Sequence, residues 1–345
     1  MSPPAQPYTL ELTSPAVLRL ESLLRDSIAL RVLNIPEPPC REPINQAAAR
    51  LAILFSGGLD CTVLARLVHD ILPLHEPVDL LNVAFENPRI HKANRGTGEQ
   101  DHDLYGECPD RVTGRASWAE LRTVCPGRDW KFVAINVPFL ETTEHREQVI
   151  ALMHPHNTEM DLSIAYALYF AARGQGYLLP SSPVLEKVLY TTSARVLLSG
   201  LGADELFAGY QRHATAFNRN SFKGLLDELD LDIGRLGKRN LGRDDRVISH
   251  WGREARYPYL DENLLTWALA APVHEKCGFG DVLVPGVEAS ESIEPGKKVL
   301  RCLAWKLGMQ RAAKEKKRAI QFGARTAKME TGKTKGTQLL SPRER

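Results

Sequence analysis

Short apolar runs alternate with helical patterns along the chain. Runs of strand length occupy 51–55, 78–87, 130–138 and the start of 194–210. Apolar residues recur every three or four positions over 14–34 and 61–70, as one face of a helix requires. Residues 110–124 are also predicted to be a helix, and 160–176 a small-residue helix that ends at a glycine. Strands that alternate with helices are typical of a doubly wound parallel sheet, so we predict an α/β fold.

The first apolar run ends in a glycine-rich turn. Residues 51–61 read LAILFSGGLDC, with Ser56, Gly57 and Gly58 between the strand and the helix that Asp60 begins. Glycines let the backbone approach a ligand, and the first N–H groups of the helix point outward, so the turn predicts an anion site. Asp60 would repel a phosphate unless Mg²⁺ lay between them. The alternative is an ordinary strand-to-helix turn that Asp60 caps.

A second turn repeats this order. Residues 194–210 read ARVLLSGLGADELFAGY, in which Ser199 and Gly200 can contact a nucleotide and Asp204 or Glu205 can offer a carboxylate to the metal. Both turns follow apolar strands directly, so we expect both at the same edge of the sheet. Taken alone, the acids could simply favour the first turn of a helix.

The chain divides into three parts. Residues 1–49 contain a helix and a linker, and residues 50–322 form the α/β domain, of which 211–322 is mainly helical. Residues 323–345 are polar and basic, so we predict an unfolded tail. The polar stretch 87–107 has no periodicity and is predicted to be a long loop.

The composition predicts a soluble protein that is long enough to bury a large core. The 345 residues are 43% hydrophobic and 25% charged, enough for a large core in one or two domains. The net charge is only +2, although residues 311–345 carry 11 Lys and Arg against 3 Asp and Glu. No apolar run approaches the roughly 18 residues of a membrane span. The six cysteines form no CxxC pair and no signal peptide is recognisable, so we expect a cytoplasmic protein.

The motifs resemble the synthetase domain of the asparagine synthetases. SGGLD, SGLGADELFAGY and EARYPYLDENL (254–264) together are similar to these AMP-forming enzymes, whose hallmark is SGGxD. The stretches PDRVTGRASWAELR, RNLGRDDRV and KKRAIQFGARTAKM extend the resemblance over about 15–330. It implies a doubly wound parallel sheet of the adenine nucleotide alpha hydrolase-like, ATP pyrophosphatase type, with a helical C-terminal subdomain.

The resemblance also implies roles for individual residues. The implied ligands of ATP and its phosphates are Phe55, Ser56, Gly57, Gly58, Asp60, Cys61, Val83, Ser199 and Gly200. Asp60 and Asp204 would hold Mg²⁺, while Lys317, Asp204 and Glu205 would act in catalysis. Arg256 would belong to the wall of the helical subdomain. For Lys317 the alternative is a solvated charged face, because it lies in KEKKR.

The implied reaction is asparagine biosynthesis. The side-chain carboxylate of aspartate would attack the α-phosphorus of ATP, giving an aspartyl adenylate and pyrophosphate, and ammonia would displace AMP. The implied partners are small molecules, together with a separate glutaminase or a longer parent protein. We expect no membrane and no nucleic acid as a partner.

Three departures from the family pattern bear on activity. Leu201 stands where the family's second turn has a catalytic glutamate, and leucine cannot accept a proton. Cys61 and Thr62 replace a Ser-Ser pair. Met1 is followed by Ser2 instead of the catalytic cysteine, and about 50 residues precede the first strand, so we expect the glutaminase domain to be absent.

Three other functions therefore stay open. One is a catalytically impaired nucleotide-binding module that acts through partners, a pseudoenzyme. Another is an amide ligase with a different substrate, like the β-lactam synthetases, and the third is RNA modification, to which the second turn does not fit.

Weaker motifs favour plain structure. His154-Pro155-His156 lacks a third ligand at useful spacing and predicts a loop. RGTGEQ (95–100) follows no strand and is not a dinucleotide fingerprint. Tyr166, Tyr169 and Phe170 lie in a small-residue helix and are predicted to belong to the core.

Overall fold

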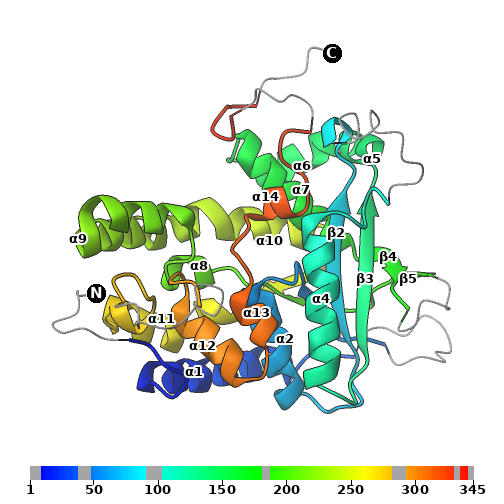
Figure 1. Cartoon of the computed structure of the whole chain (residues 1–345). Helices are drawn as coiled ribbons and strands as arrows, with labels where there is room; N and C mark the ends of the chain where they lie inside the picture. Colours follow the sequence, from blue (N-terminus) through cyan, green and yellow to red (C-terminus); the bar gives the residue numbers. More distant parts are fainter. Residues whose placement is uncertain are drawn as a thin grey trace.

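The computed structural model describes residues 9–37, 48–90, 103–180, 187–281, 293–329 and 335–340. Over this part of the chain a seven-stranded sheet has the order β5-β4-β3-β2-β1-β6-β7 (Figure 1). The strands are β1 (Leu51–Leu54), β2 (Val78–Phe85), β3 (Trp130–Val137), β4 (Gln175–Leu178), β5 (Val188–Thr191), β6 (Val196–Leu198) and β7 (Glu254–Arg256). The predicted α/β class is confirmed.

The central strands are parallel and buried on both faces. β1 pairs in parallel with β2 on one side and β6 on the other, and β2–β3 and β6–β7 are parallel too. Ile53 belongs to the core on one face, while its neighbour Ala52 belongs to the core on the other. Because successive strand residues point to opposite faces, two separate cores sandwich the sheet.

Helices cover both faces and fill the carboxyl third of the chain. They are α1 (Pro15–Val32), α2 (Leu59–Ile71), α4 (Pro109–Val124), α5 (Phe139–Glu144), α6 (Arg146–Met153), α7 (Glu159–Arg173), α8 (Ala203–Leu206), α9 (Gln211–Leu236), α10 (Gly242–Ser249), α11 (Glu262–Ala270), α12 (Lys298–Lys306), α13 (Gln310–Lys314) and α14 (Ile320–Gly323). Helices α2 and α4 pack on one face of the sheet and α7 on the other. The predicted helices at 14–34, 110–124 and 160–176 are confirmed.

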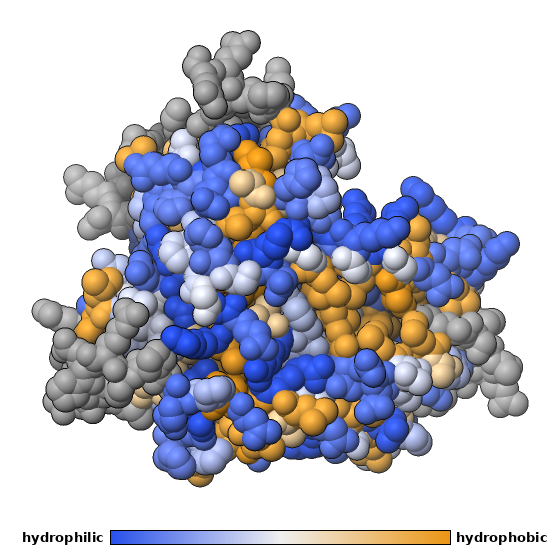
Figure 2. Space-filling view, turned by 180° about the vertical axis from the view of Figure 1, so that it is seen from behind, coloured by the Kyte–Doolittle hydropathy of each residue, from blue (hydrophilic) through white to orange (hydrophobic). Residues whose placement is uncertain are grey.

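Helix α9 extends away from the sheet (Figure 1). It is interrupted at Asn220 and Ser221, where Ser221 has a φ of +52°. Its buried leucines Leu225 and Leu229 form a small third core with residues that follow α11. Seen from behind, apolar surface gathers beneath this projecting arm (Figure 2).

An antiparallel edge was not predicted. Gly174 ends α7 with a φ of +70°, a conformation that favours glycine, and the chain turns directly into β4. β4 is antiparallel to both β3 and β5. Gly176 lies so close to β3 that a Cβ would be 2.4 Å from the Ala134 oxygen. β5 exposes Val188 and Leu189, so its burial pattern does not mark it as a core strand.

The prediction of an unfolded tail after Phe322 is wrong for the part of it that the structure describes. Ala324 is buried, and its carbonyl accepts a hydrogen bond from the Phe85 N–H at the end of β2. The Thr326 hydroxyl donates to the Ser163 carbonyl in α7, at 2.8 Å. Leu339 forms a β-bridge with Thr158. Backbone hydrogen bonds to the domain offset the polar composition on which the prediction depended.

The weaker motifs of the sequence have the following places in the structure. Tyr166, Tyr169 and Phe170 are buried, as predicted. The His154–His156 segment lies in the loop between α6 and α7. RGTGEQ and most of the 87–107 loop lie outside the described residues. No described helix is long and apolar enough to cross a membrane.

Candidate nucleotide-binding site

The first glycine-rich turn lies at the carboxyl end of β1. Phe55 follows the strand, and α2 begins at Leu59 with Gly58 as its N-cap and no capping side chain. Gly57 has a φ of +80°, and a Cβ there would be 2.5 Å from the Gly114 backbone of α4. Glycine is therefore required both by the turn and by the close approach of α4. The turn opens the N-terminus of α2 toward a cavity.

The second turn lies beside the first. β6 is the parallel neighbour of β1, and Ser199 and Gly200 follow its last residue. A Cβ on Gly200 would be 2.9 Å from the Cβ of Asp60, so the turns touch where glycine allows it. Since the chain leaves β1 toward β2 and returns to its other side at β6, this edge is a topological switch point.

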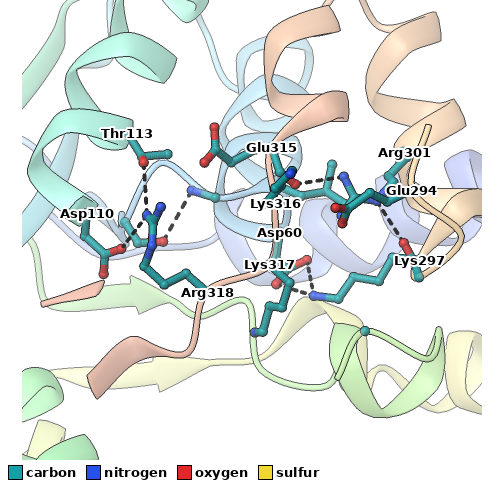
Figure 3. Close-up of a pocket in the computed structure, with 15 residues that line it drawn as sticks. Asp60, Asp110, Thr113, Glu294, Lys297, Arg301, Glu315, Lys316, Lys317 and Arg318 are labelled. Atoms are coloured by element: carbon teal, nitrogen blue, oxygen red, sulfur yellow. Dashed lines mark hydrogen bonds and ion pairs between the residues drawn. The ribbon is translucent and has the colours of Figure 1, made fainter. Parts of the chain in front are cut away.

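A lysine joins the acids of the two turns. Lys297 Nζ lies 2.8 and 2.7 Å from the two carboxylate oxygens of Asp60 (Figure 3). The same nitrogen lies 2.7 Å from Asp204 Oδ1. Asp60 is in the first turn of α2, and Asp204 in α8. Lys297 has a φ of +57° and directly precedes α12, and its N–H donates to the Phe207 carbonyl. The two predicted metal ligands thus converge on one cation.

Gly209 makes room for this ion pair. A Cβ there would be 2.0 Å from Lys297 Cε and 2.1 Å from Asp204 Oδ1. Such distances leave no space for any side chain, because both neighbours are held by their own ionic contacts.

The electrostatics of Asp204 follow from two lysines. Its burial acts to raise the pKa, but Lys297 and Lys317 outweigh burial and hold the pKa of this carboxyl well below its usual range. Lys317 Nζ lies 2.5 Å from Asp204 Oδ2. The pKa of Lys317 is raised: burial acts to lower it, and Asp204 and Asp60 act against burial. Asp204 is therefore an anion and Lys317 a cation at neutral pH.

The carboxylates have the chemistry that Mg²⁺ requires. Two carboxylates facing one point, completed by phosphate oxygens and water, are a usual protein contribution to a Mg²⁺ site. No group of three His, Cys, Asp or Glu side chains that could hold a metal occurs among the described residues. The donor set of Asp60 and Asp204 fits Mg²⁺ delivered with phosphates, and the ammonium of Lys297 now lies between these donors.

Two connected cavities open at this edge. A polar one of about 100 Å³ is lined by Ser56, Gly58, Leu59, Asp60, Asp110, Thr113, Gly209, Glu294, Gly296, Lys297, Arg301, Glu315, Lys316, Lys317 and Arg318. A larger one of about 260 Å³ shares Ser56, Gly58, Asp60, Asp110, Lys317 and Arg318 with it. One composite pocket therefore has a cationic end and a second, more apolar end.

The larger cavity provides an apolar wall. Its lining includes Phe55 from the first turn, Val83 from β2 and Ile164 and Leu168 from α7. Phe55 and Val83 are the residues predicted for the adenine side. Such a wall suits a flat heterocycle, with the phosphates directed to the cationic end.

Most of the predicted ligands line the pocket. Those lining the larger cavity are Phe55, Ser56, Gly58, Asp60, Cys61, Val83, Ser199, Gly200, Asp204 and Lys317. Cys61 is buried, and burial raises the pKa of its thiol, so it is a poor nucleophile. Leu201 lines the same cavity.

Three predicted residues have other surroundings. The Gly57 carbonyl accepts a hydrogen bond from Ser117 in α4, at 2.7 Å. Glu205 is buried behind Asp204 and accepts a hydrogen bond from the Tyr210 hydroxyl, at 2.6 Å. Burial and the charge of Asp204 raise the pKa of Glu205. Arg256 pairs with Glu254 on β7 and donates to the Arg31 carbonyl of α1, away from both cavities.

Sequence reasoning missed Lys297, Arg301, Asp110 and Arg318. Lys297 follows Gly296 just before an amphipathic helix, which is a weak signal, and only the fold shows that it meets Asp60. Asp110 and Arg318 each lie in a stretch that resembles the family, but no spacing rule joins residues about 200 positions apart. Arg301 donates to the carbonyls of Ala313 and Glu315 and so ties the C-terminal segment to α12.

The chain is similar in sequence to known proteins. A family model described as asparagine synthase matches residues 179–230 and 223–335. Asparagine synthetase domain-containing protein 1 of Mus musculus is 41% identical over 317 residues, 84% of this chain and 48% of that protein. The Homo sapiens protein of the same name is 40% identical over 307 residues, 82% of this chain and 46% of that protein. Asparagine synthetase B (glutamine-hydrolyzing) of Escherichia coli is 32% identical over 98 residues, 28% of this chain and 17% of that protein.

The fold is the mostly parallel α/β fold of the SGGxD ATP pyrophosphatases, with a helical carboxyl part. The chain belongs to the asparagine synthetase domain family. It spans about half the length of the curated relatives it matches.

Proposed function

We propose that this chain is an ATP-dependent, AMP-forming amide ligase domain that activates a carboxylate, with aspartate as the substrate and asparagine as the product. The observation that carries the proposal is the convergence of Asp60 and Asp204 on Lys297 Nζ, with Lys317 beside them. At this switch-point edge the two acids can hold Mg²⁺, and the two lysines can offset the negative charge of the phosphate oxygens.

Each part of the pocket has a proposed task. Phe55 and Val83 bind adenine, and Ser56, Gly58 and the N-terminus of α2 bind phosphate oxygens. Asp60 and Asp204 hold Mg²⁺, which supplies positive charge to the triphosphate when bound. Lys297 and Lys317, whose side chains line the pocket, would offset the negative charge of the phosphates.

The proposed reaction has two steps, formation of an acyl adenylate and its amidation. A carboxylate oxygen of the acceptor forms a bond to the α-phosphorus, and the bond to pyrophosphate breaks with its electron pair on the leaving oxygen. The ammonia nitrogen then bonds to the acyl carbon, AMP leaves with the C–O electron pair, and the nitrogen loses one proton to water. Lys317 stabilises the negative charge on the phosphoryl oxygens in both steps.

A pseudoenzyme is the second candidate, and one residue favours it. Leu201 lines the larger cavity at the position of the family's catalytic glutamate. An isobutyl group there cannot take the proton that the attacking amine releases. In this case the pocket still binds ATP, and the protein acts through partners.

The deciding experiment measures pyrophosphate release from ATP and Mg²⁺ with aspartate and ammonium. Wild type is compared with Asp60→Ala and with Leu201→Glu. Aspartate-dependent release that disappears in Asp60→Ala supports the ligase. Inert wild type with turnover gained by Leu201→Glu supports the pseudoenzyme, and wild type that binds no ATP at all contradicts both.

The cellular setting is also part of the proposal. The described cysteines Cys61, Cys108, Cys125, Cys277 and Cys302 are free thiols, which fits the reducing cytoplasm. Ammonia would come from solution, from a separate glutaminase, or from a longer parent protein. Nucleic acid and membrane are not among the proposed partners.

A further inference from the structure

Two stretches that the proposed function leaves unused meet at the pocket. PDRVTGR begins α4, and KKRAIQF crosses the carboxyl edge of the sheet between α13 and α14. Arg318 of the second stretch donates from Nη1 to the Thr113 hydroxyl of the first, at 3.3 Å. The same nitrogen lies 3.9 Å from Asp110 Oδ1, and Figure 3 shows the guanidinium between these two side chains.

Arg318 differs from three other cations of the pocket, Lys297, Lys317 and Arg301. Lys297 is held by two carboxylates and Lys317 by one, while Arg301 donates to backbone carbonyls and pairs with Glu294. Among the described residues, Arg318 has contacts only through Nη1, so Nε and Nη2 stay available. These two donors form one edge of the guanidinium fork, which matches two oxygens of a phosphate.

Asp110 is built into its place. It is 7% exposed, and a Cβ on Gly323 would be 2.1 Å from its Oδ1, so only glycine lets α14 pack against it. The Cys108 thiol donates to the Gly323 carbonyl, at 2.9 Å, and joins the same segments. The carboxyl group that faces Arg318 is therefore fixed before any ligand arrives.

The position of Arg318 points to the phosphate end of the nucleotide. Arg318 lines the polar cavity and the larger one, whereas Lys316 lines only the polar cavity, and both side chains are exposed. The apolar wall for a base lies on the far side, at β2 and α7. A group at the junction of the cavities reaches the part of ATP that becomes pyrophosphate.

We propose that Arg318 is a bidentate ligand of the β- and γ-phosphates of ATP and of the pyrophosphate product, aimed by Asp110 and Thr113 as positioning residues. The inference rests on the proposed ATP site and adds the group that recognises its diphosphate part. AMP lacks that part, so its binding does not depend on Arg318. Lysine at this position keeps the charge but loses the fork.

Binding of inorganic pyrophosphate, ATP and AMP to the full chain, measured by titration calorimetry, tests the ligand role. Arg318→Ala is expected to weaken pyrophosphate and ATP binding at least tenfold and AMP binding less than twofold. Arg318→Lys is expected to bind pyrophosphate and ATP more tightly than Arg318→Ala. It is expected to recover less than half of the lost binding free energy. Lys314→Ala is the matched control, because Lys314 lies four residues away, over the Trp305 ring, and lines neither cavity.

A double-mutant cycle tests the positioning role. Asp110→Asn is expected to weaken pyrophosphate binding about threefold in wild type and to change nothing in Arg318→Ala. Thr113→Val is expected to act in the same way. If Asp110 merely repelled the ligand, Asp110→Asn would strengthen binding in both backgrounds, and the positioning role would be wrong.

The outcomes separate this inference from the proposed function. Wild type that binds ATP and pyrophosphate, with Arg318→Ala equal to it, overturns the inference and leaves the ATP site intact. Equal losses for AMP and pyrophosphate also overturn it, since they indicate damage to the whole pocket. Wild type that binds none of the three probes overturns the proposed function itself. A variant counts as folded when its thermal unfolding midpoint equals that of the control, Lys314→Ala.

Discussion

At the scale of single residues, the site is a problem of charge balance. Asp60 and Asp204 belong to neighbouring turns and would repel each other across the strand ends without a cation between them. Lys297 supplies that cation from a backbone conformation that lysine seldom adopts. Its backbone strain is offset by the ion pairs that the side chain makes with both acids.

Removing Lys297 is expected to be costly. Lys297→Met leaves two partly buried carboxylates without their shared partner, so we expect the free energy of unfolding to fall by about 3–5 kcal/mol in urea denaturation. Lys314→Met, an exposed change, is expected to cost less than about 0.5 kcal/mol. Adding Asp60→Asn to Lys297→Met is expected to restore part of the loss. A fall no larger than that of the control would contradict the shared ion pair.

Asp110 predicts a pH dependence of stability. Burial raises its pKa to about 7, against the opposing charges of Arg318 and Lys317 and with support from Glu315. The folded state therefore keeps this proton up to about pH 7, while the unfolded chain loses it near pH 4. The contribution of Asp110 to stability falls as pH rises through this window, by about 1.4 kcal/mol per unit of pKa shift.

Asp110→Asn removes this dependence. We expect the stability of the variant, measured by urea denaturation at several pH values, to fall less than wild type between pH 4 and 7. Asp79 and Asp244, whose pKa values burial raises to about 6, stay in both proteins and set the residual slope. Parallel curves for the two proteins would contradict the buried, protonated Asp110.

At the scale of elements, α4 holds the first turn in shape. Gly114 lies against the Gly57 turn, and Asn82 of β2 donates both to the Phe55 carbonyl and to the Asp110 carbonyl, each at 2.9 Å. One amide thus joins β1, β2 and the start of α4 at the edge where the pocket opens. This arrangement depends on close backbone contact, which only small residues allow.

Gly114→Ala tests the contact. Its Cβ would be 2.6 Å from Asn82 Nδ2, so we expect a loss of stability of about 1–3 kcal/mol and weaker ATP binding. Gly234→Ala is the matched control: it lies within α9 with nothing within 4 Å, and alanine there is expected to stabilise by up to about 1 kcal/mol. Thermal unfolding of both variants decides. Stabilisation by both changes would contradict the close approach of α4.

The elements also show what a local pattern can indicate. Helices α1 and α4 and strands β1 to β3 can be predicted from the local sequence. The spacing of their apolar residues matches the positions that the fold buries. β5 does not, because it is a largely exposed edge strand. The segment after Phe322 has a disordered composition and is held by carbonyls and hydroxyls of distant elements, as in the Thr326–Ser163 hydrogen bond.

At the scale of the whole molecule, ligand binding is expected to raise the free energy of unfolding. Both faces of the sheet are covered, and the pocket is lined by residues from both halves of the chain, from Leu54 to Gln321. A ligand that binds only when these parts are assembled stabilises the folded state as a whole.

ATP with Mg²⁺ at 100 times its dissociation constant is expected to stabilise the protein by about 2.7 kcal/mol. The measurement is thermal or urea unfolding at rising ATP concentration. Asp60→Ala is expected to lose most of this effect, and EDTA is expected to reduce it in wild type. Equal stabilisation of wild type and Asp60→Ala would contradict a metal-bound triphosphate at the first turn.

The sequence by itself determined the strand–turn–helix units, the two glycine-rich turns and the family, because these depend on neighbours in the chain. Only the tertiary structure decided which charges meet. Lys297 lies 237 positions from Asp60, and Arg318 lies 205 positions from Thr113. No local period encodes such pairs; they arise because parallel strands bring their carboxyl ends to one edge and the C-terminal segment crosses it.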